Sequence, residues 1–519
     1  MLEAKVHNLL RSLCQQNKFD CDWIHSFTMA RMVARGLRLK DSTIIQTGVS
    51  HSQYSLSYLI PLLLSPSSEI LVASTSLWQT LFHQQIPLLQ QHLNSSKQVS
   101  TQPPLMPEKK TLYLLNYDSW LEHIFSSQYP QDKPQAYSFP VTVFVEAERI
   151  PDIFSSYFTR QISPSDWHLI IPKLPPSQQD YFRQSFAQLA KSIFSHPPNR
   201  YNSYLLEEEE IYLLLRLWEV IKNNRINIPE NVTQFFQTFD SREGEYVHHF
   251  CFSKNEGYFY LKATPLRLKP FFETIWQRGK FIIIGSHLDS EKNPKDYGRK
   301  IGINTEDFTC LKFSTPPQSK PLKLYIASHF PLPNTPIFAT KAIQEIAGLI
   351  STIGTNHRPI IVIIDDIPLQ SQITASLAAS FGSRVRLNES ILVQNSIIVC
   401  HTNYWLKHQE EFSNPQLSPQ LVIVPTLPIP SVENPLVSAQ VSLLKKQKKD
   451  WFRLYLLPTA IQTLQRITQP LRQYGGVLAL LDGRVNCRSY GGTILKSLEP
   501  YSKIQDYVNK TLTNTIDGV

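Results

Sequence analysis

The sequence predicts an α/β protein with two domains of parallel β-sheet, the first of which is interrupted by a mostly helical insertion. Between residues 20 and 160, short apolar runs alternate with helical segments through short connections. Such alternation is typical of a doubly wound parallel sheet. Residues 165–265 have mainly helical periodicity, and the strand–helix alternation returns from about residue 322.

The strands expected in the first domain are short apolar runs bounded by polar or proline-containing turns. They lie at residues 42–46, 69–75, 110–117, 141–148 and 280–288. Helices are expected between them at residues 56–64, 77–93 and 118–125. The polar stretch 95–109 contains prolines and is expected to be a surface loop.

The insertion is expected to contain helices at 177–194 and 205–222, followed by strands at 245–253 and 257–264. The acidic run 207–210 falls in a first helical turn, where carboxylates complement the helix dipole, so it needs no functional role.

The second domain repeats the pattern of apolar strands and amphipathic helices. Its strands are expected at residues 323–328, 359–366, 396–400, 420–424 and 476–482. Its helices are expected at residues 338–353, 368–381, a long helical stretch from 434 to 473, and a last helix.

Composition limits the chemistry that the chain can carry. The 17 glycines in 519 residues are about 3%, against a usual value of about 7%, so glycine-rich anion cradles are scarce. The net charge of +9 suits a polyanionic partner without establishing one. The six cysteines are scattered without a C-x-x-C pair, which fits a reducing compartment. The sequence has no apolar stretch of membrane-spanning length, and its N-terminus is expected to be an amphipathic helix, so we expect a soluble cytoplasmic protein without membrane contact.

The stretch TGVSHSQYSLSYLIPLLL, residues 47–64, lies between a predicted strand and a predicted helix, where nucleotide-binding proteins hold phosphate. In the pattern G-x-x-x-x-G-K-[ST], Gly48 and Ser55 match. Gln53 replaces the second glycine, and neutral Tyr54 replaces the lysine. A side chain at position 53 obstructs a backbone cradle, so we expect a vestigial phosphate loop that keeps its packing.

Two segments of the second domain identify a family. LVIVPTLPIPSVENPLVSAQ (421–440), and YLLPTAIQTLQ through GVLALLDGRV (455–485), resemble motifs of DinG/XPD-type superfamily 2 ATP-dependent DNA helicases. Weaker matches are TMARMVARGL (28–37) and DYGRKIGI (296–303). The order of elements is similar over nearly the whole chain. The resemblance implies two RecA-like domains with an arch-like insertion, ATP and Mg²⁺ as cofactors, and nucleic acid as partner.

The chain departs from the family where catalytic residues are expected. The family's D-E-A-H falls on residues 145–148, so Val145 replaces the metal-binding aspartate while Glu146 survives. The arginine motif Q-x-x-G-R-x-x-R falls on residues 466–473 without gaps, which puts Pro470 and Gln473 at the arginine positions. A shift by one residue keeps Arg472 but places glutamine at the first arginine. In either register an arginine is missing. No cysteine occurs between residues 95 and 140, so the iron–sulfur module of many relatives is not expected.

Three other patterns have a structural and a functional interpretation. His248, His249 and Cys251 share a predicted strand, whose alternation favours a buried strand over a metal site. Asp365 and Asp366 end another strand, and a solvated strand end is favoured over a relocated metal site. The third pattern is a basic cluster followed by an aromatic side chain, which suits either a nucleic-acid backbone or an exposed turn. It comprises Lys445, Lys446, Lys448, Lys449 and Trp451.

The predicted domains are residues 1–165, completed by about 265–310; the insertion at 166–264; and residues 311–519. The favoured function is that of a DinG-like helicase homologue with eroded ATPase motifs that binds nucleic acid or a protein partner without unwinding. An active ATP-dependent DNA helicase with divergent motifs and a pure protein-interaction scaffold remain as alternatives.

Overall fold

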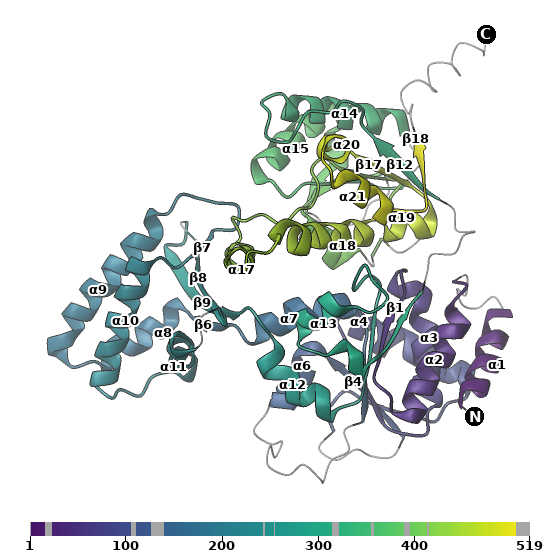
Figure 1. The fold of residues 1–519 in the computed structure, drawn as a ribbon, viewed down its shortest axis with the longest axis horizontal. Coiled ribbons are helices and arrows are strands. Elements are labelled where there is room, and N and C mark those ends of the chain that lie inside the picture. The colour runs from purple at the N-terminus through teal and green to yellow at the C-terminus, as the bar shows by residue number, and fades with distance from the viewer. Residues whose placement is uncertain are drawn as a thin grey trace.

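The computed structural model describes residues 2–15, 23–104, 110–125, 140–241, 244–253, 255–313, 321–353, 358–388, 395–409, 411–412 and 415–504. Within these residues the chain forms two parallel sheets of seven strands and an antiparallel sheet of four. Figure 1 shows each sheet in a separate lobe, with the antiparallel sheet beside the two larger lobes. The architecture is that of two RecA-like α/β domains, the first interrupted by an insertion.

The first sheet has the strand order β11-β1-β10-β5-β2-β4-β3, and every neighbouring pair is parallel. Its central strands are buried along their whole length, which explains their continuous apolar sequences. The strands are β1 (Thr43–Gln46), β2 (Glu69–Ala73), β3 (Gln98–Ser100), β4 (Thr111–Asn116), β5 (Val141–Phe144), β10 (Phe281–Gly285) and β11 (Thr309–Lys312). Strand β10, which follows the insertion, lies between β1 and β5, which precede it.

Helices cover both faces of this sheet and enclose a separate apolar core on each face. They are α1 (Leu2–Gln15), α2 (Ser26–Leu39), α3 (His51–Leu64), α4 (Thr75–Thr80), α5 (Ile86–Leu93), α6 (Tyr117–Phe125), α7 (Ile150–Tyr157), α12 (Lys269–Arg278) and α13 (Lys295–Ile301). A π-helical turn, Leu81–Gln85, joins α4 and α5 directly before Pro87. Because proline lacks an N–H group and crowds the preceding turn, a widened turn lets the helix continue.

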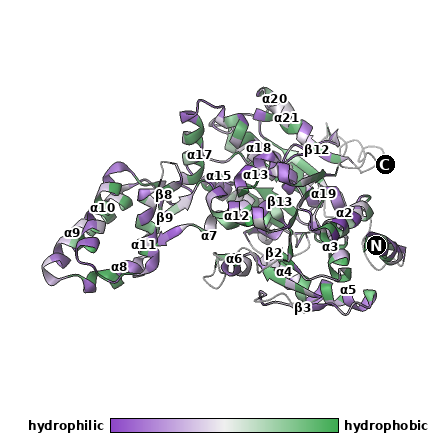
Figure 2. Cartoon of the chain, turned by 60° about the horizontal axis from the view of Figure 1, so that its bottom comes forward, coloured by the Kyte–Doolittle hydropathy of each residue, from purple (hydrophilic) through white to green (hydrophobic). Residues whose placement is uncertain are grey.

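The insertion packs four helices against one antiparallel sheet of order β6-β9-β8-β7. The strands are β6 (Arg160–Ile162), β7 (Ser203–Leu205), β8 (Tyr246–Ser253) and β9 (Tyr258–Pro265). The helices are α8 (Pro164–Ile170), α9 (Pro176–Ser195), α10 (Glu208–Asn223) and α11 (Glu230–Gln237). Hydrophilic and hydrophobic residues alternate along α9 and α10, as expected for helices that bury one face (Figure 2). Glu207 caps α10 and the Glu210 side chain accepts its N–H at 2.9 Å, which confirms a helix-start role for the acidic run.

The second sheet has the order β14-β15-β13-β16-β17-β12-β18, again with all neighbouring strands parallel. The strands are β12 (Leu322–Ile326), β13 (Ile360–Ile363), β14 (Val385–Leu387), β15 (Ile397–Cys400), β16 (Leu421–Val424), β17 (Val477–Leu480) and β18 (Tyr501–Ile504). The helices are α14 (Phe338–Ile353), α15 (Ile367–Phe381), α16 (Thr402–His408), α17 (Pro435–Lys446), α18 (Leu457–Ile467), α19 (Gln469–Tyr474), α20 (Arg484–Cys487) and α21 (Gly491–Ser497).

The predicted helical stretch from 434 to 473 is not continuous. Lys448 has a left-handed backbone (φ 54°), which ends α17 and separates it from the π-helical turn Phe452–Leu456 that begins the next helical run. That run divides again at Thr468, whose hydroxyl donates to the Gln465 carbonyl at 2.9 Å. The prediction of one long stretch was therefore wrong at the turn that carries the lysine cluster.

Two predicted polar clusters have structural partners. His248 bonds Thr238 at 2.8 Å, whereas His249 bonds Thr264 at 3.1 Å; the neighbouring rings bond different elements. Asp366 caps α15, and the Asp365 carboxylate accepts from the backbone N–H and the hydroxyl of Thr402. In the described parts of the chain, no three His, Cys, Asp or Glu side chains are grouped as a metal site.

The cysteines differ in part from the expectation of scattered reduced thiols. Cys251, Cys310, Cys400 and Cys487 are free, but Cys14 is disulfide-bonded, so the argument for a reducing compartment does not extend to Cys14. Among the described helices, none is both long and apolar enough to span a bilayer.

Candidate functional site

In the loop between β1 and α3, where the sequence predicts a phosphate loop, backbone amides donate hydrogen bonds to other protein groups. Gly48 has a positive φ of 71°, which glycine adopts without strain. The amides of Thr47 and Gly48 donate to the carbonyls of Gly285 and Ser286, each at 2.9 Å. Val49 donates to the Thr47 hydroxyl at 3.4 Å, and Gln53 donates to the Ser50 carbonyl at 3.1 Å. Fewer amides are left to surround an anion.

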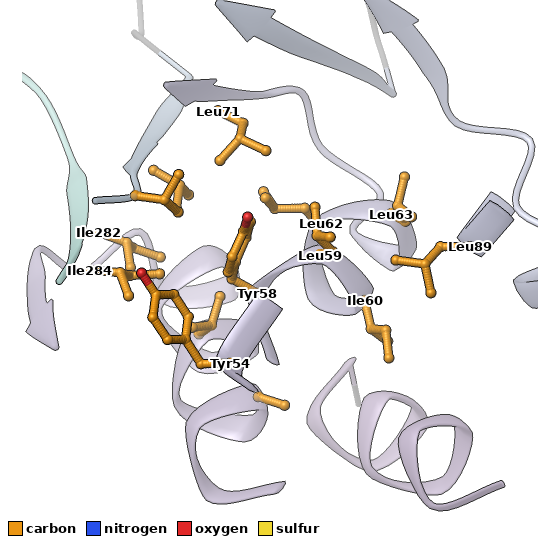
Figure 3. Close-up of a cluster of buried hydrophobic side chains, with 14 of the residues drawn as sticks. Tyr54, Tyr58, Leu59, Ile60, Leu62, Leu63, Leu71, Leu89, Ile282 and Ile284 are labelled. Carbon is orange, nitrogen blue, oxygen red and sulfur yellow. The ribbon is translucent and has the colours of Figure 1, made fainter. Parts of the chain in front are cut away.

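Tyr54, at the lysine position, belongs to the apolar core. Its side chain is 1% exposed and points toward Ile282 and Ile284 of β10 (Figure 3). The Tyr54 ring lies 5.3 Å from the His51 ring and 6.2 Å from the Tyr58 ring. The first turns of α3 therefore contribute a packed aromatic cluster where a P-loop presents an ammonium group.

The other polar side chains of this helix start are neutral or engaged. Burial lowers the pKa of His51 to about 3, so this ring is uncharged at neutral pH, and its Nε2 bonds the Tyr58 hydroxyl at 2.7 Å. The Ser55 hydroxyl, which the pattern assigns to Mg²⁺, donates to the Ser52 carbonyl at 3.3 Å.

The polar groups of the segment after β5 bond other protein groups. Val145 is fully buried, and its carbonyl accepts from the Tyr117 hydroxyl at 2.6 Å. Glu146 has a left-handed backbone (φ 56°), accepts from the Ser74 amide at 3.2 Å and lies 3.5 Å from Arg149. Burial raises the pKa of Glu146, and Arg149 opposes that shift. Its carboxylate is thus held by protein groups.

Glu148, two residues further on, connects this segment to the end of β10. Its carboxylate accepts from the Ser286 hydroxyl at 2.8 Å and from the Ser286 amide at 3.3 Å. Arg466, from α18 of the second domain, is half-buried and interacts electrostatically with this carboxylate: burial lowers the Arg466 pKa, and Glu148 and Asp152 oppose that shift. Sequence reasoning missed Glu148, Ser286 and Arg466; the acid at the fourth position of V-E-A-E was the available signal.

A side-chain amide of the second domain contacts the loop between β1 and α3. Gln473 of α19 accepts from the Ser50 hydroxyl at 2.7 Å. Arg472 instead donates to the carbonyls of Leu498 and Pro500 at 2.6 and 3.2 Å, and burial lowers its pKa to about 10. Gln469, the first arginine position of the shifted register, accepts from Gln409 at 3.3 Å.

Comparison with known proteins supports the relationship that the motifs indicate. The ATP-dependent DNA helicase YoaA of Escherichia coli (strain K12) is 23% identical over 261 residues, 48% of this chain and 40% of that protein. The 3'-5' exonuclease DinG of Bacillus subtilis (strain 168) is 28% identical over 140 residues, 26% of this chain and 15% of that protein. The chain spans less than half the length of these relatives. No family model matches the sequence.

Solved structures agree with the same fold. An apo form of XPD superposes with a TM-score of 0.59 over 92% of this chain and 99% of that structure, at 13% identity. The Xpd4 protein of S. tokodaii gives a TM-score of 0.57 over 92% of this chain and 99% of that structure, at 11% identity. The chain is therefore similar in sequence to parts of YoaA and DinG, and similar in fold to XPD.

Between the two RecA-like domains and the insertion lies a cavity of about 1840 Å³. Arg200 of the insertion, Arg267 of the first domain and Lys449 of the second lie in its walls. Among the described lining residues, nine are Lys or Arg and seven are Asp or Glu, so the excess of positive charge is small. The insertion contacts the second domain directly, where Arg200 donates to the Asp365 carbonyl at 3.3 Å and α17 packs against β7 and β8.

The lysine cluster spans the last turn of α17 and the turn that follows it, and its Lys449 lines this cavity. Its four lysines are exposed, and the Lys445 ammonium group lies 5.2 Å from the centre of the Trp451 ring. Trp451 itself is half-buried against a small apolar cluster, so one part of its ring already packs on the protein. The cluster is an exposed turn, and its role toward nucleic acid stays a prediction.

Proposed function

We propose that this chain binds single-stranded nucleic acid in the cleft between its three parts and does not hydrolyse ATP to unwind duplexes. Burial of Tyr54 in the core supports the loss of hydrolysis most strongly, because no ammonium group faces the β,γ-phosphates there. Val145 and Gln473 support the same conclusion, since neither holds Mg²⁺ nor stabilises the charge of a transition state.

ATP turnover should therefore stay at background when Mg²⁺ and single-stranded DNA are added to the purified protein. A single arginine finger contributes about 10³–10⁵ in rate, and this chain also lacks the lysine and the aspartate. A coupled assay over a range of DNA concentrations measures this, with Glu146→Gln as the matched control. DNA-stimulated turnover that Glu146→Gln abolishes would favour the alternative of an active, divergent helicase.

Nucleic-acid binding is expected to be independent of sequence and sensitive to salt. Exposed lysines near the cleft contact phosphates and release counterions, so affinity falls as salt rises. Replacing the four cluster lysines by glutamine should weaken binding of a fluorescent oligo-dT and lower the slope of log affinity against log salt by up to about 3. The substitutions are Lys445→Gln, Lys446→Gln, Lys448→Gln and Lys449→Gln.

A matched control changes four exposed lysines of the same domain that do not line the cavity, namely Lys323, Lys341, Lys496 and Lys503. An equal loss in this control would show that only net charge matters. Absence of binding by the unmodified protein at low salt would favour a protein-interaction scaffold.

A further inference from the structure

In the described parts of the chain, direct hydrogen bonds join the two RecA-like domains at three places. The Ser50 hydroxyl donates to the Gln473 amide oxygen at 2.7 Å. The Gln462 amide donates to the Leu288 carbonyl at 2.7 Å, and the Arg149 guanidinium donates to the Leu406 carbonyl at 3.3 Å. Each place pairs one group of the first domain with one group of the second.

The three contacts follow three neighbouring strands of the first sheet. Ser50 comes after β1, Leu288 after β10 and Arg149 after β5, and these strands are adjacent in the order β1-β10-β5. Their partners lie on α19, α18 and α16 of the second domain. Contacts spread along one edge of a sheet oppose rotation of the domains as well as their separation. We call this set the interdomain bridges.

Because the Gln473 side chain is a neutral amide, it can bond Ser50 of the first domain without a ligand between the two domains. The amide oxygen accepts from Ser50, and the amide nitrogen donates to the Tyr474 hydroxyl at 2.9 Å, which orients the group. Ser50 is 3% exposed and Gln473 is half-buried, so this contact is partly shielded from water. Two neutral groups lose less hydration on burial than a charge does, and an arginine here would need a counter-charge that the loop serines do not supply.

We propose that the interdomain bridges keep the two RecA-like domains closed in the absence of nucleotide, so that the cleft binds nucleic acid with an affinity that ATP and ADP do not change. The second half of this statement rests on the proposed function; the first half does not. The protein is then a permanent clamp whose closure is built from its own side chains.

The distance between the domains tests the closure directly. Spin labels are attached through an unnatural keto amino acid at Leu88 and Leu387, which are exposed positions of the first and second domain. A pulsed dipolar measurement should give one narrow distance distribution, unchanged by ADP or by a non-hydrolysable ATP analogue with Mg²⁺. A second population that nucleotide shifts would overturn the proposal.

Substitutions in the interdomain bridges should weaken the closed state of the two domains. Gln473→Ala and Gln462→Ala should each lower the ratio of closed to open protein about fivefold, the effect of one hydrogen bond of ordinary net strength, and together should broaden the distribution. Gln465→Ala is the matched control, because the Gln465 amide donates to the Ser497 carbonyl at 3.1 Å within the second domain. A bridge double variant with the same distribution as the control would also overturn the proposal.

Oligo-dT binding, measured with and without nucleotide, distinguishes permanent closure of the domains from nucleic-acid binding. Equal affinity without nucleotide, with ADP and with the ATP analogue is the expected result. Binding that requires nucleotide would overturn the permanent clamp while leaving nucleic-acid binding intact. No binding under any condition, together with one narrow distance distribution, would refute the proposed function and leave the closed state standing.

Discussion

Restoring the phosphate-loop pattern by Gln53→Gly and Tyr54→Lys should lower the free energy of unfolding by about 3–5 kcal/mol without producing ATP turnover. Tyr54 is 1% exposed, and its neighbours in the core include Tyr58, Val145 and Ile284. A lysine there either buries an ammonium group among apolar and neutral side chains or leaves the core and opens a cavity. Glycine in the first turn of α3 adds a smaller cost of up to about 1 kcal/mol.

ATP hydrolysis should remain absent because the double substitution changes only the predicted phosphate loop. Val145 still provides no metal ligand, and Gln473 still stands at an arginine position. Urea unfolding followed by circular dichroism measures the stability, and a coupled assay measures turnover. Tyr54→Phe is the matched control: it keeps the ring in the core, so its loss should be much smaller than that of the double variant. A double variant that is as stable as the unmodified protein and hydrolyses ATP in response to DNA would contradict this account.

The order of strands and helices follows from the sequence because each central strand is a short apolar run buried on both faces, such as residues 281–285 of β10. Contacts between distant segments do not follow in this way. Ser50 and Gln473 are 423 positions apart, and Glu148 and Ser286 are 138 apart, so no local pattern predicts that their side chains meet. The break at Lys448 was missed for a different reason: a left-handed residue other than glycine leaves no local signature.

At the catalytic motifs, the sequence predicts which family residues are missing more readily than it predicts what the residues in their place contact. The resemblance places Tyr54 and Val145 where a lysine and an aspartate are expected, and in its ungapped register it places Gln473 at an arginine position. What these residues do instead depends on tertiary packing: Tyr54 joins the core, and Gln473 bonds the opposite domain. A motif comparison predicts which residues differ from the family pattern, whereas the fold shows which groups those residues contact.

Acidification from pH 7 to pH 5 should lower the free energy of unfolding, with about 4 kcal/mol of the loss coming from His51 and His249 together. Burial lowers the pKa of His51 to about 3 and that of His249 to about 4. Both rings bond neutral hydroxyls, His51 that of Tyr58 at 2.7 Å and His249 that of Thr264 at 3.1 Å. Neither bond favours the protonated ring over the neutral one as a nearby carboxylate would. Burial also lowers the pKa of His248 to about 4 and that of His287 to about 3, so these rings add to the loss.

Stability falls on acidification because the histidines have a lower pKa in the folded than in the unfolded protein. An unfolded histidine takes up a proton below its ordinary pKa of about 6.5, whereas the folded rings stay neutral until about pH 3 and pH 4. The unfolded state therefore binds more protons below pH 6.5, and stability that is complete above that pH is lost as the pH falls, by about 2 kcal/mol for each ring at pH 5. Urea unfolding at the two pH values measures the loss. His51→Gln keeps a hydrogen-bonding group that does not titrate, so it should reduce the loss by about 2 kcal/mol. His83→Gln, at an exposed position, should leave the loss unchanged. An equal loss in the unmodified protein and in His51→Gln would show that His51 does not control the acid response.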